Sequence, residues 1–296
     1  MKRTKPKSRR APFLIALLLA LAAAALIGVM TLNASLLHVM KATVTLPDLP
    51  PSFEGAKLLY ITDIDLCGLN TPARAADAVM KLQNLRPDLL VLGGDFTSPT
   101  LMEVLNKSAD TQSMLGRRSA FFQAISDFQA PMGRFVLIGR EDAALSDPSA
   151  ALRAGGFTPI NGTRSQISIG DDALWLVGVD ENTEGLSSVG ASFRSGQCVL
   201  CVAESPDCFP RIVTAEAADS GPWADLCLAG KTHGGQINLF GRSILTLTEL
   251  EQQFLHGWTR ETGTPMLTSS GLGCETANLR LNSQAEVWLL TLTANP

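Results

Sequence analysis

The stretch Gly230-Lys-Thr-His-Gly-Gly-Gln-Ile237 decides the fold. An apolar run from Leu226 to Ala229 leads into it, and a second apolar run, residues 237–240, leaves it. This layout predicts a buried strand, a tight glycine turn and a second strand, which together form a hairpin. The glycines beside His233 let a ligand or another backbone segment come close. Alone, the stretch is equally typical of a hairpin with a chance histidine, so the other strands have to be considered with it.

Working outward, five apolar strands end in polar residues. Open α/β sheets place their ligand sites at the carboxyl ends of their strands, so polar groups that gather there are expected to converge. The five clusters are, in chain order, Asp63-Ile-Asp65, Gly94-Asp95, Gly139-Arg-Glu-Asp142, Glu204 and Gly230-Lys-Thr-His233.

Helical and strand patterns alternate in the first half of the chain, and strand patterns dominate the second half. This order predicts an α/β protein with two sheets and helices on the outside. The expected strands are residues 42–46, 57–62, 88–92, 134–138, 166–169, 173–179, 198–203, 226–229, 265–269 and 286–293. The expected helices are residues 71–85, 121–128, 148–154 and 207–217.

The amino-terminal end reads as a membrane anchor. Residues 13–30 are uncharged and apolar on all faces, and six of the first ten residues are basic. A run of this length spans a bilayer core, and the basic flank places the amino terminus inside. We therefore expect a cytoplasmic segment (1–10), a transmembrane anchor (11–37) and a domain (42–296) on the extracytoplasmic side of the cell membrane. A cleaved signal peptide is the alternative, because Ala22-Ala23-Ala24 is compatible with a cleavage site.

Composition and cysteine spacing argue against a general nucleic-acid-binding protein and against a disulfide-stabilised protein. A net charge of −4 over 296 residues argues against a general nucleic-acid binder. The six cysteines do not have the spacing of a disulfide framework. Cys198 and Cys201 form a CxxC inside a predicted strand, where they would point to opposite faces. Buried free thiols are therefore expected.

The five clusters resemble the motifs of the calcineurin-like metallophosphoesterases, in particular their membrane-anchored bacterial branch. The family's blocks run DxH, GD, GNH[DE], a lone His and GHxH, and the resemblance extends from about Val44 to Leu292. It implies a four-layer α/β/β/α sandwich of two mixed sheets, here preceded by one transmembrane helix. It also implies a site for two metal ions that clamp a phosphoryl group.

The resemblance assigns the first metal position to Asp63, Asp65, Asp95 and His233. Asp65 stands where the family has a histidine, and aspartate is still a competent ligand for a hard or borderline ion. We therefore expect either one divalent metal ion, manganese, magnesium or calcium, or none.

The second metal position is substituted. Its matching residues are Asp95, Arg140, Glu204 and Lys231. Arginine and lysine have no lone pair to donate and would repel a cation, so the second site is expected to be lost. Instead, Arg140 and Lys231 are expected to pair with Asp63, Asp95, Glu204 and Glu141. Glu141 occupies the position of the family's catalytic histidine, so no residue is assigned as catalytic.

These substitutions leave the enzyme question open. The favoured hypothesis is a degenerate metallophosphoesterase with little or no activity, which binds a ligand that contains phosphate, or a partner that the sequence does not name. The alternatives are a residual one-metal hydrolase acting on a phosphoester such as a lipid head group, and a structural envelope protein. Of the other two histidines, His38 is expected at the membrane surface and His256 in a loop.

Overall fold

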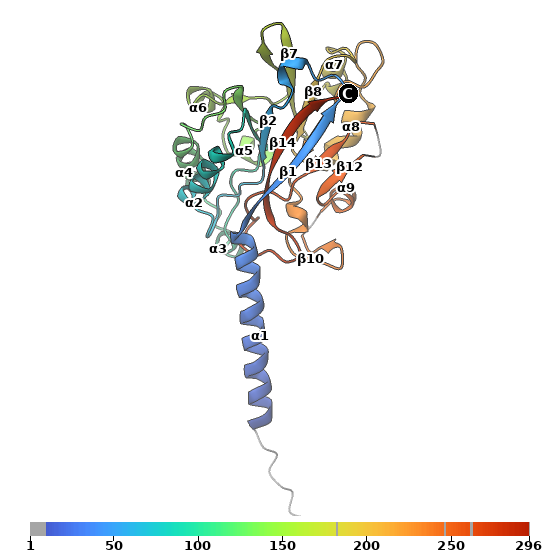
Figure 1. Ribbon diagram of the computed structural model, residues 1–296. Helices are drawn as coiled ribbons and strands as arrows, with labels where there is room; N and C mark the ends of the chain where they lie inside the picture. Colours follow the sequence, from blue (N-terminus) through green and yellow to red (C-terminus); the bar gives the residue numbers. More distant parts are fainter. Residues whose placement is uncertain (1–9, 182, 246, 261–262, 296) are drawn as a thin grey trace, which may run out of the picture.

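The protein is a sandwich of two sheets from which one long helix projects (Figure 1). The structure is a computed structural model that describes residues 10–181, 183–245, 247–260 and 263–295. The projecting helix is α1 (Arg10–Ser35). Its segment Pro12–Ser35 is long and apolar enough to cross a membrane, a property that membrane anchors share with signal sequences.

The first sheet is mixed. Its first two strands run parallel to each other, the third runs antiparallel to the second, and the remaining strands run parallel to the third. In spatial order the strands are β1 (Leu37–Leu46), β14 (Ala285–Ala294), β2 (Lys57–Ile61), β3 (Leu89–Leu92), β4 (Gly133–Val136) and β5 (Thr158–Pro159).

The second sheet is also mixed, with four parallel central strands and an antiparallel strand at each edge. Its order is β12 (Gly257–Thr259), β13 (Met266–Thr268), β9 (Leu226–Ala229), β8 (Val199–Ala203), β7 (Asp172–Val179) and β6 (Arg164–Ile169). A separate short hairpin pairs β10 (Asn238–Leu239) with β11 (Arg242–Ser243).

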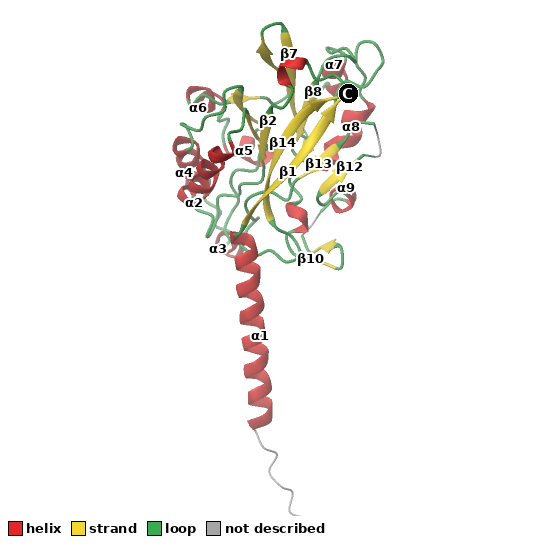
Figure 2. Cartoon of the chain, viewed as in Figure 1, coloured by secondary structure: helices red, strands yellow, loops and turns green. Residues whose placement is uncertain are grey.

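Helices cover the outer faces of both sheets (Figure 2). The longest of these covering helices are α2 and α4. The Thr71 hydroxyl caps α2, which has proline at its first position. The helices after α1 are α2 (Pro72–Leu82), α3 (Leu101–Leu105), α4 (Thr111–Ala124), α5 (Arg140–Leu145), α6 (Ser149–Ala154), α7 (Leu186–Gly190), α8 (Phe209–Thr214) and α9 (Glu249–Gln253). The described part of the chain also contains the 3-10 turns η1 (Pro51–Phe53), η2 (Gln83–Leu85), η3 (Pro206–Cys208) and η4 (His233–Gly235).

Alternation along the strands builds the layers. In β2, Leu58 and Tyr60 belong to the buried cluster between the two sheets. Leu59 and Ile61 belong to the cluster under α2 and α4, because successive side chains of a strand point to opposite faces. A third cluster packs the second sheet against α7 and α8. The expected four-layer sandwich of two mixed sheets is therefore confirmed.

The same alternation explains the cysteines. All six are free and buried. Cys198 lies between the sheets, whereas Cys201 lies on the helix-covered face. The prediction that Cys198 and Cys201 point to opposite faces of their strand is confirmed.

Several predicted elements differ from the structure. The stretch after β9 is not a hairpin: the chain passes through η4, and residue 237 forms a single bridge with Leu281 before β10 pairs with β11. The glycines here turn the chain out of the sheet instead of folding it back. β1 begins at Leu37, five residues before the predicted strand, because it pairs with the whole of β14. α4 begins at Thr111, ten residues earlier than expected and directly after its Asp110 cap.

Candidate functional site

The polar strand ends of the two sheets meet at one edge of the sandwich. The backbone N–H of Lys231, just after β9, donates to both carboxylate oxygens of Asp63, just after β2, at 2.9 and 3.0 Å. Within the first sheet, Asp63 N–H donates to Gly94 O at 3.1 Å and Asp65 N–H donates to Asp95 O at 3.0 Å. The expected convergence of these clusters is confirmed.

The loop after β4 closes the same edge. A Cβ atom added at Gly139 would lie 2.6 Å from Asp95 Oδ1 and 3.5 Å from Glu204 Oε1. Glycine is needed here because a Cβ atom would clash with the Asp95 carboxylate. The Arg140 N–H, one residue further, donates to Glu204 Oε1 at 2.8 Å.

Backbone strain is concentrated at this edge. Five site residues adopt left-handed backbone, with φ of 50° at Asp63, 45° at Asp65, 52° at Asp95, 72° at Lys231 and 51° at His233. Non-glycine residues avoid this region, and such strain clusters at ligand sites because surrounding contacts must hold it. The local geometry therefore marks this edge independently of the residue types.

The Asp63 and Asp65 carboxylates of the first position are buried, and nearby positive charge compensates them only in part. Burial raises the pKa of Asp63 to about 7, although the Lys231 backbone N–H and Arg280 oppose the rise. Burial, followed by the charge of Asp63, raises the pKa values of Asp65 and Asp95. The Oδ2 atom of buried Asp65 has no hydrogen-bond partner among the described residues. Such a set is stabilised by a cation.

His233 lies beside this set with a neutral imidazole. Burial, with a contribution from Arg280, lowers the pKa of His233 to about 3. Its Nε2 lies 3.7 Å from Asp65 Oδ2. Its Nδ1 is buried and has no hydrogen-bond partner in the described part of the chain. A neutral imidazole keeps the lone pair that a metal ion requires.

The donors of the first position therefore fit one divalent cation by chemistry, through the orphaned atoms of Asp65 and His233. Within the described ranges, no three His, Cys, Asp or Glu side chains already surround a common point as metal ligands. A bound ion would have to draw the side chains inward.

An ion-pair network joins the two cations that the resemblance assigns to the second position. Glu181 Oε1 lies 2.6 Å from Lys231 Nζ, and Glu181 Oε2 lies 2.6 Å from Arg140 Nη1. A weaker pair joins Lys231 Nζ to Glu251 Oε1 at 3.9 Å. The hydrogen bond from Lys231 is the largest effect that lowers the pKa of Glu181. A second divalent ion does not fit beside these two cations.

This network corrects the predicted pairing. The side-chain partner of both cations is Glu181, rather than the expected Asp63, Asp95, Glu204 or Glu141. Glu181 follows Val179 and Asp180 at the end of β7, so the rule that singled out the other strand ends would also have found it. Glu141 is exposed in the first turn of α5.

Glu204 is buried, and burial raises its pKa. One of its oxygens accepts the Arg140 N–H, and Oε2 has no partner among the described residues. Glu204 thus lies beside the network with one oxygen atom free to accept a donor.

Two supporting residues add rigidity. Asp142 accepts the Phe96 N–H at 2.8 Å and lies 3.6 Å from Arg118, so it fixes the loop that carries Asp95. Arg280 is fully buried and donates to the carbonyl oxygen of His233 at 3.0 Å. The sequence drew attention to Asp142 without assigning it a role, and it gave no role to Arg280.

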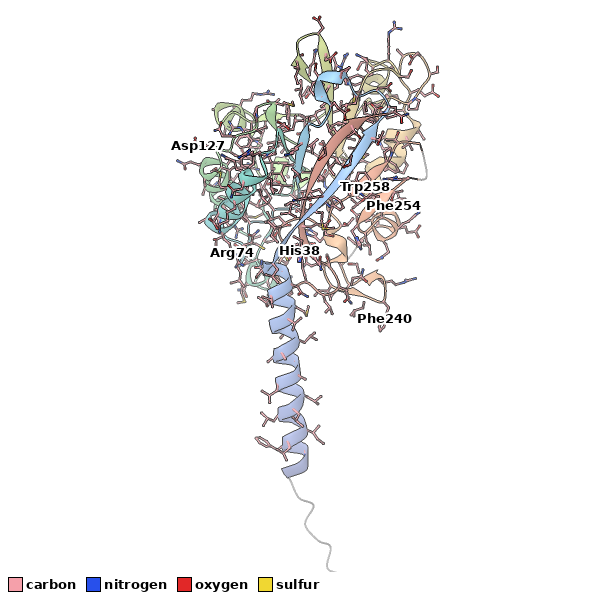
Figure 3. All side chains as sticks on the ribbon, viewed as in Figure 1. His38, Arg74, Asp127, Phe240, Phe254 and Trp258 are labelled. Carbon is pink, nitrogen blue, oxygen red and sulfur yellow. The ribbon has the colours of Figure 1, made fainter. Side chains whose placement is uncertain are left out.

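The other two histidines lie away from these carboxylates. His38 is on β1, next to the end of α1 (Figure 3). His256 is exposed, and both residues line a groove with Trp288 at the base of the sandwich. The expectation that neither belongs to the strand-end site agrees with this placement.

Comparison with known proteins finds distant relatives over most of the chain, and their names include a phosphodiesterase and uncharacterized metallophosphoesterases. No family model matches the chain. Phosphodiesterase YaeI of Escherichia coli strain K12 is 25% identical over 240 residues, which are 80% of this chain and 82% of that protein. The uncharacterized metallophosphoesterase YkuE of Bacillus subtilis strain 168 is 23% identical over 266 residues, 86% of this chain and 84% of that protein.

Two solved structures are similar at lower sequence identity. A dimetal phosphatase from Danio rerio aligns with a TM-score of 0.42 and 12% identity, covering 74% of this chain and 88% of that one. GAP50, the anchor in the inner membrane complex of Plasmodium, aligns with a TM-score of 0.43 and 11% identity over 79% of each chain. Metallophosphoesterases typically bind divalent metals.

Proposed function

We propose that the protein is a membrane-anchored metallophosphoesterase relative that binds at most one divalent cation and a ligand containing phosphate, with little or no phosphoester hydrolysis. The observation that carries this proposal is the position of Glu181, which holds Lys231 and Arg140 at 2.6 Å each. The two cations stand where a second metal ion would need ligands. In this proposal the ion pairs of Glu181 with Lys231 and Arg140 take the place of the second ion.

Asp63, Asp65, Asp95 and His233 would hold the single cation. Their raised carboxyl pKa values and the neutral imidazole support this assignment. When bound, such an ion would polarise a phosphoryl oxygen. Glu141, which stands where the family has its catalytic histidine, presents an exposed carboxyl group in place of an imidazole.

The ligand is inferred from the accessible cations. The Arg140 side chain is 45% exposed and the Lys231 side chain is 23% exposed, so both reach solvent from the site edge. A guanidinium offers phosphate two parallel N–H donors, and a phosphate oxygen would compete with Glu181 for both cations.

Anchoring by α1 is the second part of the proposal. The helix is almost entirely exposed in the described structure, as expected for a segment that lies in lipid. The basic residues that precede it favour an amino terminus on the cytoplasmic side and a domain on the extracytoplasmic side of the cell membrane.

A residual one-metal phosphodiesterase is the second candidate. The name of the Escherichia coli relative, a phosphodiesterase, favours it. In that case Lys231 and Arg140 would stabilise the negative charge of the transition state in place of the second ion.

The test is the metal content and activity of the full chain, purified in detergent with manganese. We expect about one ion per chain by elemental mass spectrometry, with loss of the ion on Asp95→Ala. Asp147→Ala, on an exposed loop, is the matched control and should keep the ion. Bis(p-nitrophenyl) phosphate should not be hydrolysed above the rate of the Asp95→Ala variant.

Two results would contradict the proposal. About two ions per chain would show that the second position is functional. Hydrolysis that depends on Asp95 and is lost on Lys231→Ala would establish the phosphodiesterase alternative. Phosphate binding is measured by calorimetry, and it should weaken on Arg140→Ala but not on Arg242→Ala, an exposed arginine in β11.

A further inference from the structure

The exposed apolar side chains outside α1 are not scattered. In the described part of the chain, the large ones lie on the loop after β2, on α3, on the β10–β11 hairpin and beside the end of α1. Figure 1 shows α3 and β10 on either side of the point where α1 leaves the domain. Single exposed apolar residues are ordinary, whereas a group around one helix needs an explanation.

Helix α3 contributes four of these side chains. Leu101, Met102, Val104 and Leu105 are exposed by 47%, 63%, 47% and 67%. A five-residue helix with four exposed apolar residues hides none of them in the domain. The Leu101 N–H donates to Thr276 O at 3.0 Å, which fixes the start of the helix.

The β10–β11 hairpin contributes three more. Leu239 and Ile244 are exposed by 44% and 59%, and Phe240 at the tip is fully exposed. In Figure 3, Phe240 lies at the end of the domain from which α1 projects. The Asn238 N–H donates to Leu281 O at 2.9 Å, which attaches the hairpin to the same segment that fixes α3.

This segment, residues 276–281, also holds α1. The Arg280 N–H donates to Met30 O at 3.0 Å, and the Asn33 side-chain amide donates to Arg280 O at 3.5 Å. Leu69, itself 54% exposed, is attached through a 2.7 Å bond from its N–H to Asn278 Oδ1. The three apolar groups and the projecting helix are therefore parts of one bonded unit.

The strand directions place the candidate site at the same end. β1 begins directly after α1 and runs away from it. β14 is parallel to β1, and β2 is antiparallel to β14, so β2 ends near α1 and delivers Asp63 there. The start of β7, at Asp172, lies at the opposite end, because β7 is parallel to β8 and β9, and β9 ends beside Asp63.

We propose that this apolar rim, formed by the exposed residues of α3, the β10–β11 hairpin and Leu69, inserts into the interfacial layer of the bilayer that α1 spans. The partner that this rim contacts is a lipid surface, because the rim flanks a helix that is itself apolar and exposed. Lys107, just after α3, and Arg242, in β11, are exposed basic residues beside the rim, as suits contact with anionic lipid.

The physical consequence is that the domain is held against the membrane surface and does not move freely at the end of α1. A weak apolar contact is sufficient, because α1 already holds the rim at the membrane and gives it a high effective concentration there. Insertion of the apolar rim also brings the strand-end site to the membrane surface. The inference rests on the proposed anchor role of α1, but not on the proposed metal or phosphate binding.

The test is depth-dependent quenching of a fluorescent label on the full chain in vesicles that contain anionic phospholipid. A nitrobenzoxadiazole label is placed on Phe240→Cys or on Met102→Cys, and the buried native thiols remain unlabelled. The matched control is Asp171→Cys, an exposed position in the turn before β7 at the opposite end. Lipids with a spin label on the acyl chain should reduce emission about two-fold or more at 240 and 102, but not at 171.

Quenching at 240 and 102 no stronger than at 171 would overturn the proposal. A blue-shifted label that lipid does not quench would also overturn it, by assigning the rim to a protein contact such as a second copy. Met102→Asp in the Phe240→Cys chain should reduce quenching at 240. Cleavage of α1 as a signal peptide would be a separate result. Mass spectrometry of the chain from native membranes would then show that the residues before about 30 are missing.

Discussion

Replacement of Arg280 by methionine should strongly destabilise the domain. The Arg280 side chain is fully buried. Its guanidinium donates to three carbonyls of the loop after β13, Ser270 O at 2.6 Å, Gly271 O at 3.1 Å and Gly273 O at 2.6 Å. It also donates to His233 O at 3.0 Å. Methionine has a similar length but no donor, so each acceptor would lose the bond from Arg280; Gly271 O and His233 O would keep a backbone N–H donor.

The magnitude follows from the number and charge of these bonds. Two further donations, to Ser283 Oγ and Gln284 O, are each 2.9 Å long. Hydrogen bonds to a charged group contribute about 1.5–3 kcal/mol each, but they are not additive within one side chain. Breaking a buried charged network typically costs about 3–5 kcal/mol, and this is the loss that we expect. The Asp63 and Asp65 carboxyls would also lose a nearby positive charge.

The assay is urea unfolding of the full chain in detergent, followed by tryptophan fluorescence. Arg280→Lys is the matched variant, because it keeps the charge but presents three donors from one nitrogen. It should recover about half of the loss. If Arg280→Met does not yield a folded chain, the lysine variant still measures the contribution of the guanidinium geometry.

The reasoning would be refuted by a loss below about 1 kcal/mol for Arg280→Met. Equal stabilities of the lysine and methionine variants would also contradict it, because donor geometry would then contribute nothing. A normal stability with a displaced His233 loop would show that other contacts hold the domain.

Two further predictions concern stability. Burial, with the charge of Asp48, raises the pKa of Asp225 to about 7, although the Val199 N–H opposes the rise. The folded chain then binds more protons than the unfolded chain between about pH 4 and 7, so stability falls as pH rises through this range. Asp225→Asn keeps the acceptor, and between pH 5 and 8 its free energy of unfolding should change by about 1–2 kcal/mol less than that of the unsubstituted chain, after a discount for solvent screening. An equal change of unfolding free energy with pH in both chains, measured by urea unfolding, would contradict this. Thr71→Ala removes the cap that accepts the Arg74 N–H and should cost about 1 kcal/mol, whereas Thr71→Ser should cost little.

The candidate site could be predicted from sequence as far as its location and most of its members. Asp63, Asp95 and His233 follow apolar strands, and this local signal depends only on neighbouring residues. Glu181 was missed although it also follows a strand. Its importance comes from reaching two cations on other strands, and no local pattern reports such a distance.

By itself, the sequence determined the two-sheet architecture, the apolar helix and the convergence of polar strand ends. Alternation and strand-end polarity are properties of consecutive residues, so they can be read along the chain. The tertiary structure alone decided the partner of Lys231 and Arg140, the left-handed backbone of the site and the role of Arg280. It also decided that α3 and the β10–β11 hairpin surround α1. These features depend on contacts between segments far apart in the chain, whose energies change over a few tenths of an ångström to a few ångströms.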